Sequence, residues 1–155
     1  MSSGSGLPTP RSGQIRRIPG VEAPELGNRR DLLVHLPSSY GDRSEHRYPV
    51  LYMQDGQNLF DPEGSFAGSW EVDEAVHAQA PRGAEAIVVG VPNTGADRIH
   101  EYSPFHQEGY GGGQGDAYLR FLIDTVKPRV DRRFRTLPSR DRTGIAGSSL
   151  GALIS

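Results

Sequence analysis

Three short apolar runs, separated by helix-like segments, constrain the fold of this chain most strongly. The runs cover residues 50–53, 86–91 and 143–146, and none of them contains a charged side chain. Runs that are apolar on both faces are typical of parallel strands covered by helices on each side. Because strands that alternate with helices favour a parallel sheet, the sequence predicts an α/β fold with a mostly parallel sheet and helices on both faces.

Residues 29–36 form another expected strand, which ends in an apolar run and is closed by Pro37. Before it, residues 1–14 are rich in Ser, Gly, Pro and Arg, a composition that cannot pack a core. We therefore expect a flexible N-terminal segment over residues 1–14 and folded structure from about Ile15.

Two segments between the strands have helical patterns. Ser69 can cap a helix from Trp70 to about Gln79, which Pro81 would end. Trp70 is expected to pack into the core, as tryptophan at such a position usually does, and the alternative is a binding platform.

A second helix is predicted after residue 115, with Asp116 as its cap. Pro128 lies inside this pattern and is expected to kink the helix or end it early, because proline lacks a backbone donor. The apolar positions at three- and four-residue spacing are Leu119, Leu122, Ile123, Val126 and Val130.

The charge pattern excludes a nucleic-acid partner. The net charge is −2 and the pI is about 6.2, so the chain lacks the basic surface that a phosphate backbone requires. The basic pairs at residues 16–17 and 29–30 are short and far apart in sequence, and we expect both to lie on the solvated surface.

Composition also limits cofactors and location. The chain has no cysteine, which excludes disulfides, thiolate metal sites and a cysteine nucleophile. No metal and no other cofactor is expected, because the histidines lack metal-ligand spacing and suit surface or structural roles. No stretch approaches the roughly 20 apolar residues of a membrane span, and no apolar signal segment begins the chain, so we expect no membrane association and a cytoplasmic location. The histidines are His35, His46, His77, His100 and His106.

The most informative motif is Gly147-Ser148-Ser149-Leu150-Gly151, a G-x-S-x-G sequence between the last strand and a helix-like run. In a nucleophile elbow the serine occupies a strained strand-to-helix turn, and a Cβ at either glycine would collide with neighbouring backbone. Ser149 is therefore the candidate nucleophile, and the alternative is an ordinary Gly-Ser turn. An acid and a histidine follow such an elbow in chain order, so we expect both beyond Ser155.

Met53-Gln54-Asp55-Gly56-Gln57-Asn58 directly follows another predicted strand. Acyl transfer needs two backbone N–H groups to stabilise the developing oxyanion. Gly56 would let the backbone come close, and the N–H groups of Gln57 and Leu150 would be the two donors. The alternative is a simple Asp-Gly turn.

A glycine-rich segment, residues 109–115, precedes the second predicted helix. It resembles a phosphate-binding loop only superficially, because no strand leads into it and no Lys-Ser or Lys-Thr follows. We interpret it as a flexible lid or a substrate-side loop.

The ordered blocks of the sequence resemble the putative-esterase family of α/β-hydrolases over about residues 28–155. This family includes S-formylglutathione hydrolases, enterochelin and feruloyl esterases, and the related mycolyltransferases. The blocks are Leu51 to Phe60, Trp70 with Val72-Asp73-Glu74, Arg98 with Glu101-Tyr102 and Pro104, Gly115-Asp116, and Thr143 to Ser155.

The resemblance implies an α/β-hydrolase fold truncated after the nucleophile elbow, so that residues 15–155 are the N-terminal part of one domain. It implies a serine esterase that forms an acyl-enzyme on Ser149 and acts on a small-molecule ester or thioester, with Asp55, Gly56 and Asn58 in the substrate cleft. An acyltransferase and a non-catalytic binding module of the same fold remain alternatives, and the ester itself stays open.

Overall fold

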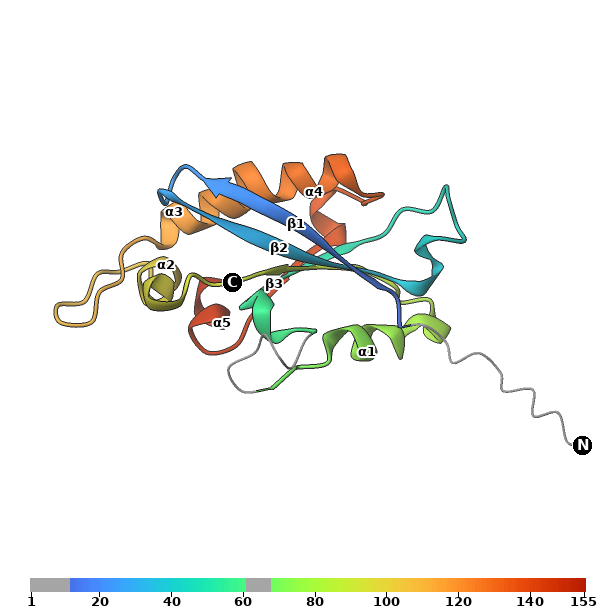
Figure 1. The fold of residues 1–155 in the computed structure, drawn as a ribbon, viewed down its shortest axis with the longest axis horizontal. Coiled ribbons are helices and arrows are strands. Elements are labelled where there is room, and N and C mark those ends of the chain that lie inside the picture. The colour runs from blue at the N-terminus through green and yellow to red at the C-terminus, as the bar shows by residue number, and fades with distance from the viewer. Residues whose placement is uncertain (1–11, 61–67) are drawn as a thin grey trace, which may run out of the picture.

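The computed structural model describes residues 12–60 and 68–155 (Figure 1). The segment expected to be flexible, residues 1–14, therefore lies almost entirely outside the described residues. The first strand, β1, begins at Gln14, one residue before the start at Ile15 that the sequence predicted.

A five-stranded mixed sheet forms the centre of the molecule, in the order β1-β2-β4-β3-β5. β3 pairs in parallel with both β4 and β5, as predicted, whereas β1 and β2 continue the sheet in antiparallel fashion. All four strands that the sequence predicted are present. The strands are β1 (Gln14–Ala23), β2 (Asn28–Leu36), β3 (Val50–Gln54), β4 (Ile87–Val91) and β5 (Thr143–Ala146).

The β1–β2 hairpin was not predicted, and its burial explains why. Only Ile18, Val21 and Ala23 of β1 are buried, and the other seven of its ten residues are exposed, so the strand has no continuous apolar run. A register shift between Ile18 and Val21 also interrupts the alternation of side chains. An edge strand of this kind gives a weak pattern in the sequence.

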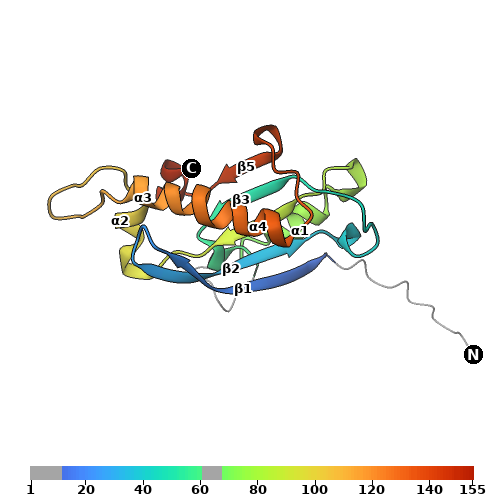
Figure 2. The ribbon, with the colours of Figure 1, turned by 90° about the horizontal axis from the view of Figure 1, so that it is seen from above.

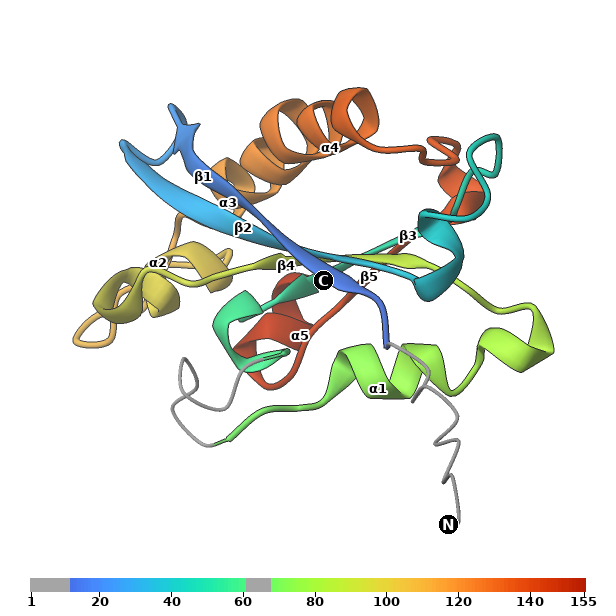
Figure 3. The ribbon, with the colours of Figure 1, turned by 45° about the vertical axis from the view of Figure 1, so that its right-hand side comes forward.

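Helices cover both faces of the sheet (Figure 3). α3 (Gly115–Arg120), a π-helical stretch (Phe121–Val126) and α4 (Lys127–Arg133) form one continuous helical run over one face. α1 (Val72–His77) and α5 (Leu150–Ile154) lie on the other face. Seen from above, the long run lies roughly along the strands, between the sheet edges formed by β1 and β5 (Figure 2). No helix in the described ranges is long and apolar enough to cross a membrane.

Both predicted helix starts are wrong in detail. α1 begins at Val72, and the Ser69 hydroxyl accepts the N–H of Glu71, which precedes the helix, rather than an N–H within it. Asp116 does not cap α3, because the helix already begins at Gly115. Asp116 lies instead in the first turn, where a carboxylate interacts favourably with the helix dipole.

Pro128 does not end the long helical run, and the apolar side chains of Val126 and Val130 on either side of it are buried. It lies in the first turn of α4, directly after the π-helical stretch, a position at which proline is tolerated. The wider π turn changes the rotation per residue, so the predicted apolar spacing fails within it. Ile123 is consequently 63% exposed, whereas Leu122 and Val126 are buried.

A buried ion pair joins β2 to α2 (Arg98–Tyr102). Two nitrogens of the Arg30 guanidinium donate to the two carboxylate oxygens of Glu101 at 2.8 Å each, and the side chains are only 3% and 1% exposed. The guanidinium also lies over the Phe121 ring, 5.0 Å from its centroid. The prediction that residues 29–30 are both solvated is therefore wrong for Arg30, whose charge is neutralised inside the core.

His35 has the structural role that the sequence predicted for the histidines. Its ring is buried, and Nε2 lies 2.7 Å from the carbonyl oxygen of Ser12. Burial lowers the pKa of His35 below its ordinary value because the charged ring would lose its hydration.

Removal of Glu101 tests the buried pair. We expect Glu101→Ala to lower the free energy of unfolding by about 3–5 kcal/mol, because Arg30 would remain charged and unpaired in the core. Urea unfolding monitored by circular dichroism measures this change. Arg17→Ala is the control, since Arg17 pairs with Asp31 at the surface, and it should change stability little. Equal effects of the two variants would contradict the structural role of the Arg30–Glu101 pair.

Candidate active site

The structure places Ser149 on the turn between β5 and α5. Its backbone has φ 56° and ψ −125°, a region that a non-glycine residue occupies only under strain. A Cβ on Gly147 would lie 2.4 Å from the carbonyl carbon of Gly151, which is closer than any real contact. The turn therefore requires glycine at 147 and presents the Ser149 side chain to solvent.

The turn after β3 lies beside this elbow, because β3 and β5 are neighbouring parallel strands whose carboxyl ends meet at one edge of the sheet. A 3₁₀ turn, Gly56–Asn58, follows β3 through Asp55. A Cβ on Gly56 would lie 2.5 Å from the carbonyl carbon of Gly90. Glycine at 56 therefore allows the turn to pack directly on the backbone of β4.

Two backbone donors in these turns have no partner among the described residues. Within residues 12–60 and 68–155, neither the N–H of Gln57 nor the N–H of Leu150 donates a hydrogen bond. Unpaired donors cost free energy unless water or a ligand accepts from them. Both are consequently available to an oxygen atom placed between the turn after β3 and the elbow.

An open cavity of about 580 Å³ lies over these turns. A second cavity, of about 630 Å³, lies beside Tyr40 and Arg135, at the end of the sheet away from the elbow. The first cavity brings together most of the residues predicted for the site. It is lined by Asp55, Gln57, Asn58, Trp70, Asn93, Arg98, Ser148 and Ser149.

Asp55 contributes little free surface to the cavity, because its polar groups are already paired. The residue is 3% exposed and has a left-handed backbone with φ 55°. Its carboxylate accepts from Nε and Nη2 of Arg98 at 2.8 and 2.9 Å and from Nδ2 of Asn93 at 2.8 Å. The hydrogen bonds between Arg98 and Asp55 raise the pKa of Arg98, because they stabilise the charged guanidinium.

Two buried tyrosines support this end of β3 from below. The N–H of Asp55 donates to the hydroxyl oxygen of Tyr102 at 3.2 Å, and the Tyr118 hydroxyl donates to the amide oxygen of Gln54. Burial raises the pKa of Tyr102 to about 12, so its oxygen stays protonated at neutral pH. The turn after β3 is therefore held by neutral hydrogen-bonding groups, Tyr102 and Tyr118, and by the ion pair between Asp55 and Arg98.

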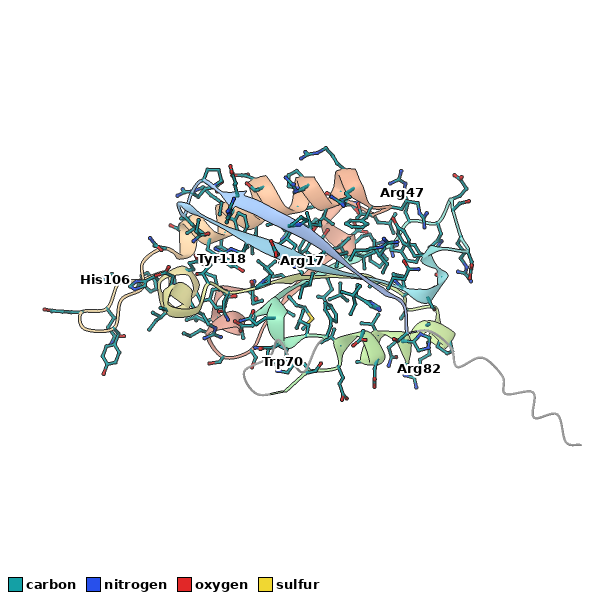
Figure 4. All side chains as sticks on the ribbon, in the orientation of Figure 1. Arg17, Arg47, Trp70, Arg82, His106 and Tyr118 are labelled. Carbon is teal, nitrogen blue, oxygen red and sulfur yellow. The ribbon has the colours of Figure 1, made fainter. Side chains whose placement is uncertain are left out.

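Trp70 lies at the cavity rather than in the core, so the prediction of core packing is wrong. The residue is 39% exposed, and its backbone N–H donates to the carbonyl oxygen of Asn58 at 2.8 Å. Figure 4 shows Trp70 beside the turn that follows β3. Because α1 begins only at Val72, Trp70 belongs to the preceding loop, and its ring forms part of the cavity wall.

The glycine-rich segment does not reach the cavity. Residues 109–114 belong to a loop that projects beyond α2 and α3 (Figure 1), Gly115 begins α3, and none of these residues lines the site. The loop instead closes on itself, since the N–H of Gln107 donates to the carbonyl oxygen of Gly111 at 2.7 Å. The expected role as a substrate-side loop therefore finds no support in the geometry.

Composition and spacing did not identify Asn93, or Arg98 as a partner of Asp55. Both follow the carboxyl end of β4, just as Asp55 follows β3. Polar residues after neighbouring parallel strands meet at the same edge of the sheet. This placement was the signal that could have found them.

Comparison with known proteins identifies relatives over nearly the whole chain. A family model described as Putative esterase matches residues 23–155. The uncharacterized protein YbbA of Bacillus subtilis (strain 168) is 30% identical over 137 residues, which are 84% of this chain and 50% of that protein. The chain therefore spans about half the length of this relative.

Solved structures share the fold at low sequence identity. An IroE-like serine hydrolase from Shewanella oneidensis has a TM-score of 0.71 and 24% identity, over 91% of this chain and 44% of its own. The siderophore hydrolase EstB from Aspergillus nidulans has 0.64 and 23%, over 96% and 53%. The ferulic acid esterase AmCE1/Fae1A from Anaeromyces mucronatus has 0.60 and 22%, over 89% and 50%. The likeness confirms the α/β-hydrolase fold.

Alanine at the two elbow glycines tests the packing of this turn. Gly147→Ala should lower the free energy of unfolding by about 3 kcal/mol, because its Cβ meets rigid backbone. Gly151→Ala should cost less, about 1–2 kcal/mol, since its Cβ would lie 3.1 Å from the Cβ of Gln54 and 3.2 Å from Oδ2 of Asp55 and not against backbone, so a shift of a few tenths of an ångström relieves both contacts. Thermal and urea unfolding measure both changes.

Gly41→Ala is the matched control for these variants, because no heavy atom lies within 4 Å of its added Cβ and its φ is −73°. It should leave stability nearly unchanged. A Gly147→Ala variant as stable as Gly41→Ala would show that the elbow is not packed as described.

Proposed function

Because this chain belongs to the Putative esterase family, we propose that the protein it forms is a serine esterase that hydrolyses small-molecule esters. The observation that carries the proposal is the strained, exposed Ser149 on the wall of a cavity, beside two unpaired backbone donors. A strained serine at a strand-to-helix turn is the arrangement that acyl transfer uses.

In the proposed reaction, each of these groups has one role. The Ser149 hydroxyl oxygen forms a bond to the ester carbonyl carbon and passes its proton to a general base, while the carbonyl π electrons move to oxygen. The N–H groups of Gln57 and Leu150 hold that oxyanion. When the tetrahedral intermediate collapses, the alcohol leaves with a proton, and attack by water on the acyl-enzyme then releases the acid. In the chain order of this fold, the base is a histidine that follows the nucleophile.

The cavity supports a small-molecule substrate. Its wall combines the exposed Trp70 ring with the polar side chains of Asn58 and Asn93, which suits an ester that has both an apolar and a polar part. The solved relatives include a siderophore hydrolase and a ferulic acid esterase. The two names agree on hydrolysis and differ in the compound that is hydrolysed, so no single ester is proposed.

Replacement of the nucleophile tests the proposal directly. The full-length protein should hydrolyse a short-chain aryl ester and react with a fluorophosphonate probe at Ser149. Ser149→Ala should lower kcat by about a thousandfold or more and abolish labelling, because the other groups cannot replace a nucleophile. Ester hydrolysis and mass spectrometry of the labelled peptide measure the two effects.

Ser148→Ala is the matched control, since Ser148 lines the same cavity without occupying the strained position; it should keep most of the activity. Full activity of Ser149→Ala would refute the nucleophile. A wild-type protein with neither turnover nor labelling would favour a non-catalytic binding module.

Two substitutions of Gln57 test the oxyanion donor. Gln57→Pro removes the N–H and should lower kcat about a hundredfold or more, whereas a 3₁₀ turn accepts the φ of proline. Gln57→Ala keeps the N–H and loses only the side-chain bond to the N–H of Asn93, so most activity should remain. Steady-state kinetics, with thermal melting as the check on folding, separates them. Normal rates for both variants would exclude Gln57 as a donor.

A further inference from the structure

The two unpaired donors belong to elements that are far apart in the chain, and Asp55 contacts both elements. Its own backbone leads into the turn that contains Gln57. Its Oδ2 atom lies 3.2 Å from the position that a Cβ on Gly151 would take, so the carboxylate packs against the first turn of α5. The Leu150 donor begins that same turn.

The carboxylate of Asp55 is held rigidly by two neighbours. Arg98 donates through Nε and Nη2, which fixes the plane of the carboxylate as well as its position. Asn93 donates to the same carboxylate through Nδ2, and its backbone N–H donates to Oε1 of Gln57 at 3.1 Å. Asn93 thus connects the carboxylate of Asp55 to the residue that carries the first donor.

Arg98 is itself fixed. Its guanidinium lies over the Tyr102 ring at 5.0 Å from the centroid, and the Tyr102 hydroxyl oxygen accepts the N–H of Asp55. The Arg98 side chain is 27% exposed and lines the cavity that contains Ser149. An arginine whose guanidinium forms two hydrogen bonds to one carboxylate and stacks on an aromatic ring has little freedom to move toward a substrate.

We propose that Arg98 and Asp55 are positioning residues that hold the Gln57 and Leu150 N–H groups in register with each other. The catalytic consequence rests on the proposed esterase function, whereas the positioning itself concerns only the folded chain. Two donors that share one oxyanion must be placed within a fraction of an ångström. The ion pair supplies that constraint from α2, an element outside both turns.

The kinetic test separates positioning from substrate binding. Arg98→Met in the full-length protein should lower kcat for an aryl ester about ten- to a hundredfold and change KM less than about twofold, because the oxyanion develops only in the transition state. Arg98→Lys should recover part of kcat, since lysine keeps the charge without the planar fork. A raised KM with normal kcat would assign Arg98 to substrate binding and overturn the proposal, as would unchanged kinetics.

A second measurement does not depend on activity. In Arg98→Met, amide hydrogen exchange should become at least about threefold faster in residues 55–59 and 147–152, the segments that the ion pair holds. The β1–β2 hairpin should exchange as in the wild type. Arg17→Met is the control, because it breaks an exposed ion pair on that hairpin, and it should leave both site segments and the kinetics unchanged.

The two measurements distinguish the possible failures. Wild-type protein without Ser149-dependent turnover would refute the esterase function, and the exchange data would still decide the positioning. Unchanged exchange in residues 55–59 and 147–152 of Arg98→Met would overturn the positioning even in an active enzyme. If Arg98→Met does not fold, the same two measurements on Arg98→Lys decide in the same way, with a smaller expected change.

Discussion

At the carboxyl end of the sheet, backbone segments approach one another so closely that two positions require glycine, and the site is built around these contacts. Gly56 packs on the backbone of β4, and Gly147 packs on the backbone of α5, with no room for a methyl group at either position. Only this spacing lets the turn after β3 and the elbow after β5 face one cavity. The strained Ser149 and the unpaired donors beside it follow from the same packing.

The short helix α2 links the core to this edge of the sheet through two ion pairs. Glu101 pairs with Arg30 inside the protein, and Arg98, three residues earlier on the helix, pairs with Asp55 at the cavity. A helix of five residues has almost no stability alone, so these two ion pairs, together with the packing of Tyr102, set its place. Buried ion pairs add little net stability, but removing one partner leaves an unpaired charge and lowers the free energy of unfolding. Positions of α2 that separate the paired charges are therefore disfavoured.

The sequence predicted regular structure best where one type of side chain dominates a segment. The strands 50–54 and 87–91 are continuous apolar runs, and they were found within a residue of their ends. β1 was missed because most of its side chains face solvent. The exposure of Ile123 was missed because a π-helical stretch changes the helical period there. The apolar spacing of the sequence gives no sign of such a stretch.

Two local features can be read from the order of residues alone: a serine between glycines on a strand-to-helix turn, and an Asp-Gly turn after a buried strand. These features depend on sterics within a few residues, which the order of side chains encodes directly. Contacts between distant groups depend instead on how the whole chain packs. Asp55 and Arg98 are 43 residues apart, and Arg30 and Glu101 are 71 residues apart. From the sequence, a charged side chain is expected to lie in solvent, because a charge can be buried only beside an opposite charge. Which residue supplies that opposite charge is set by the fold.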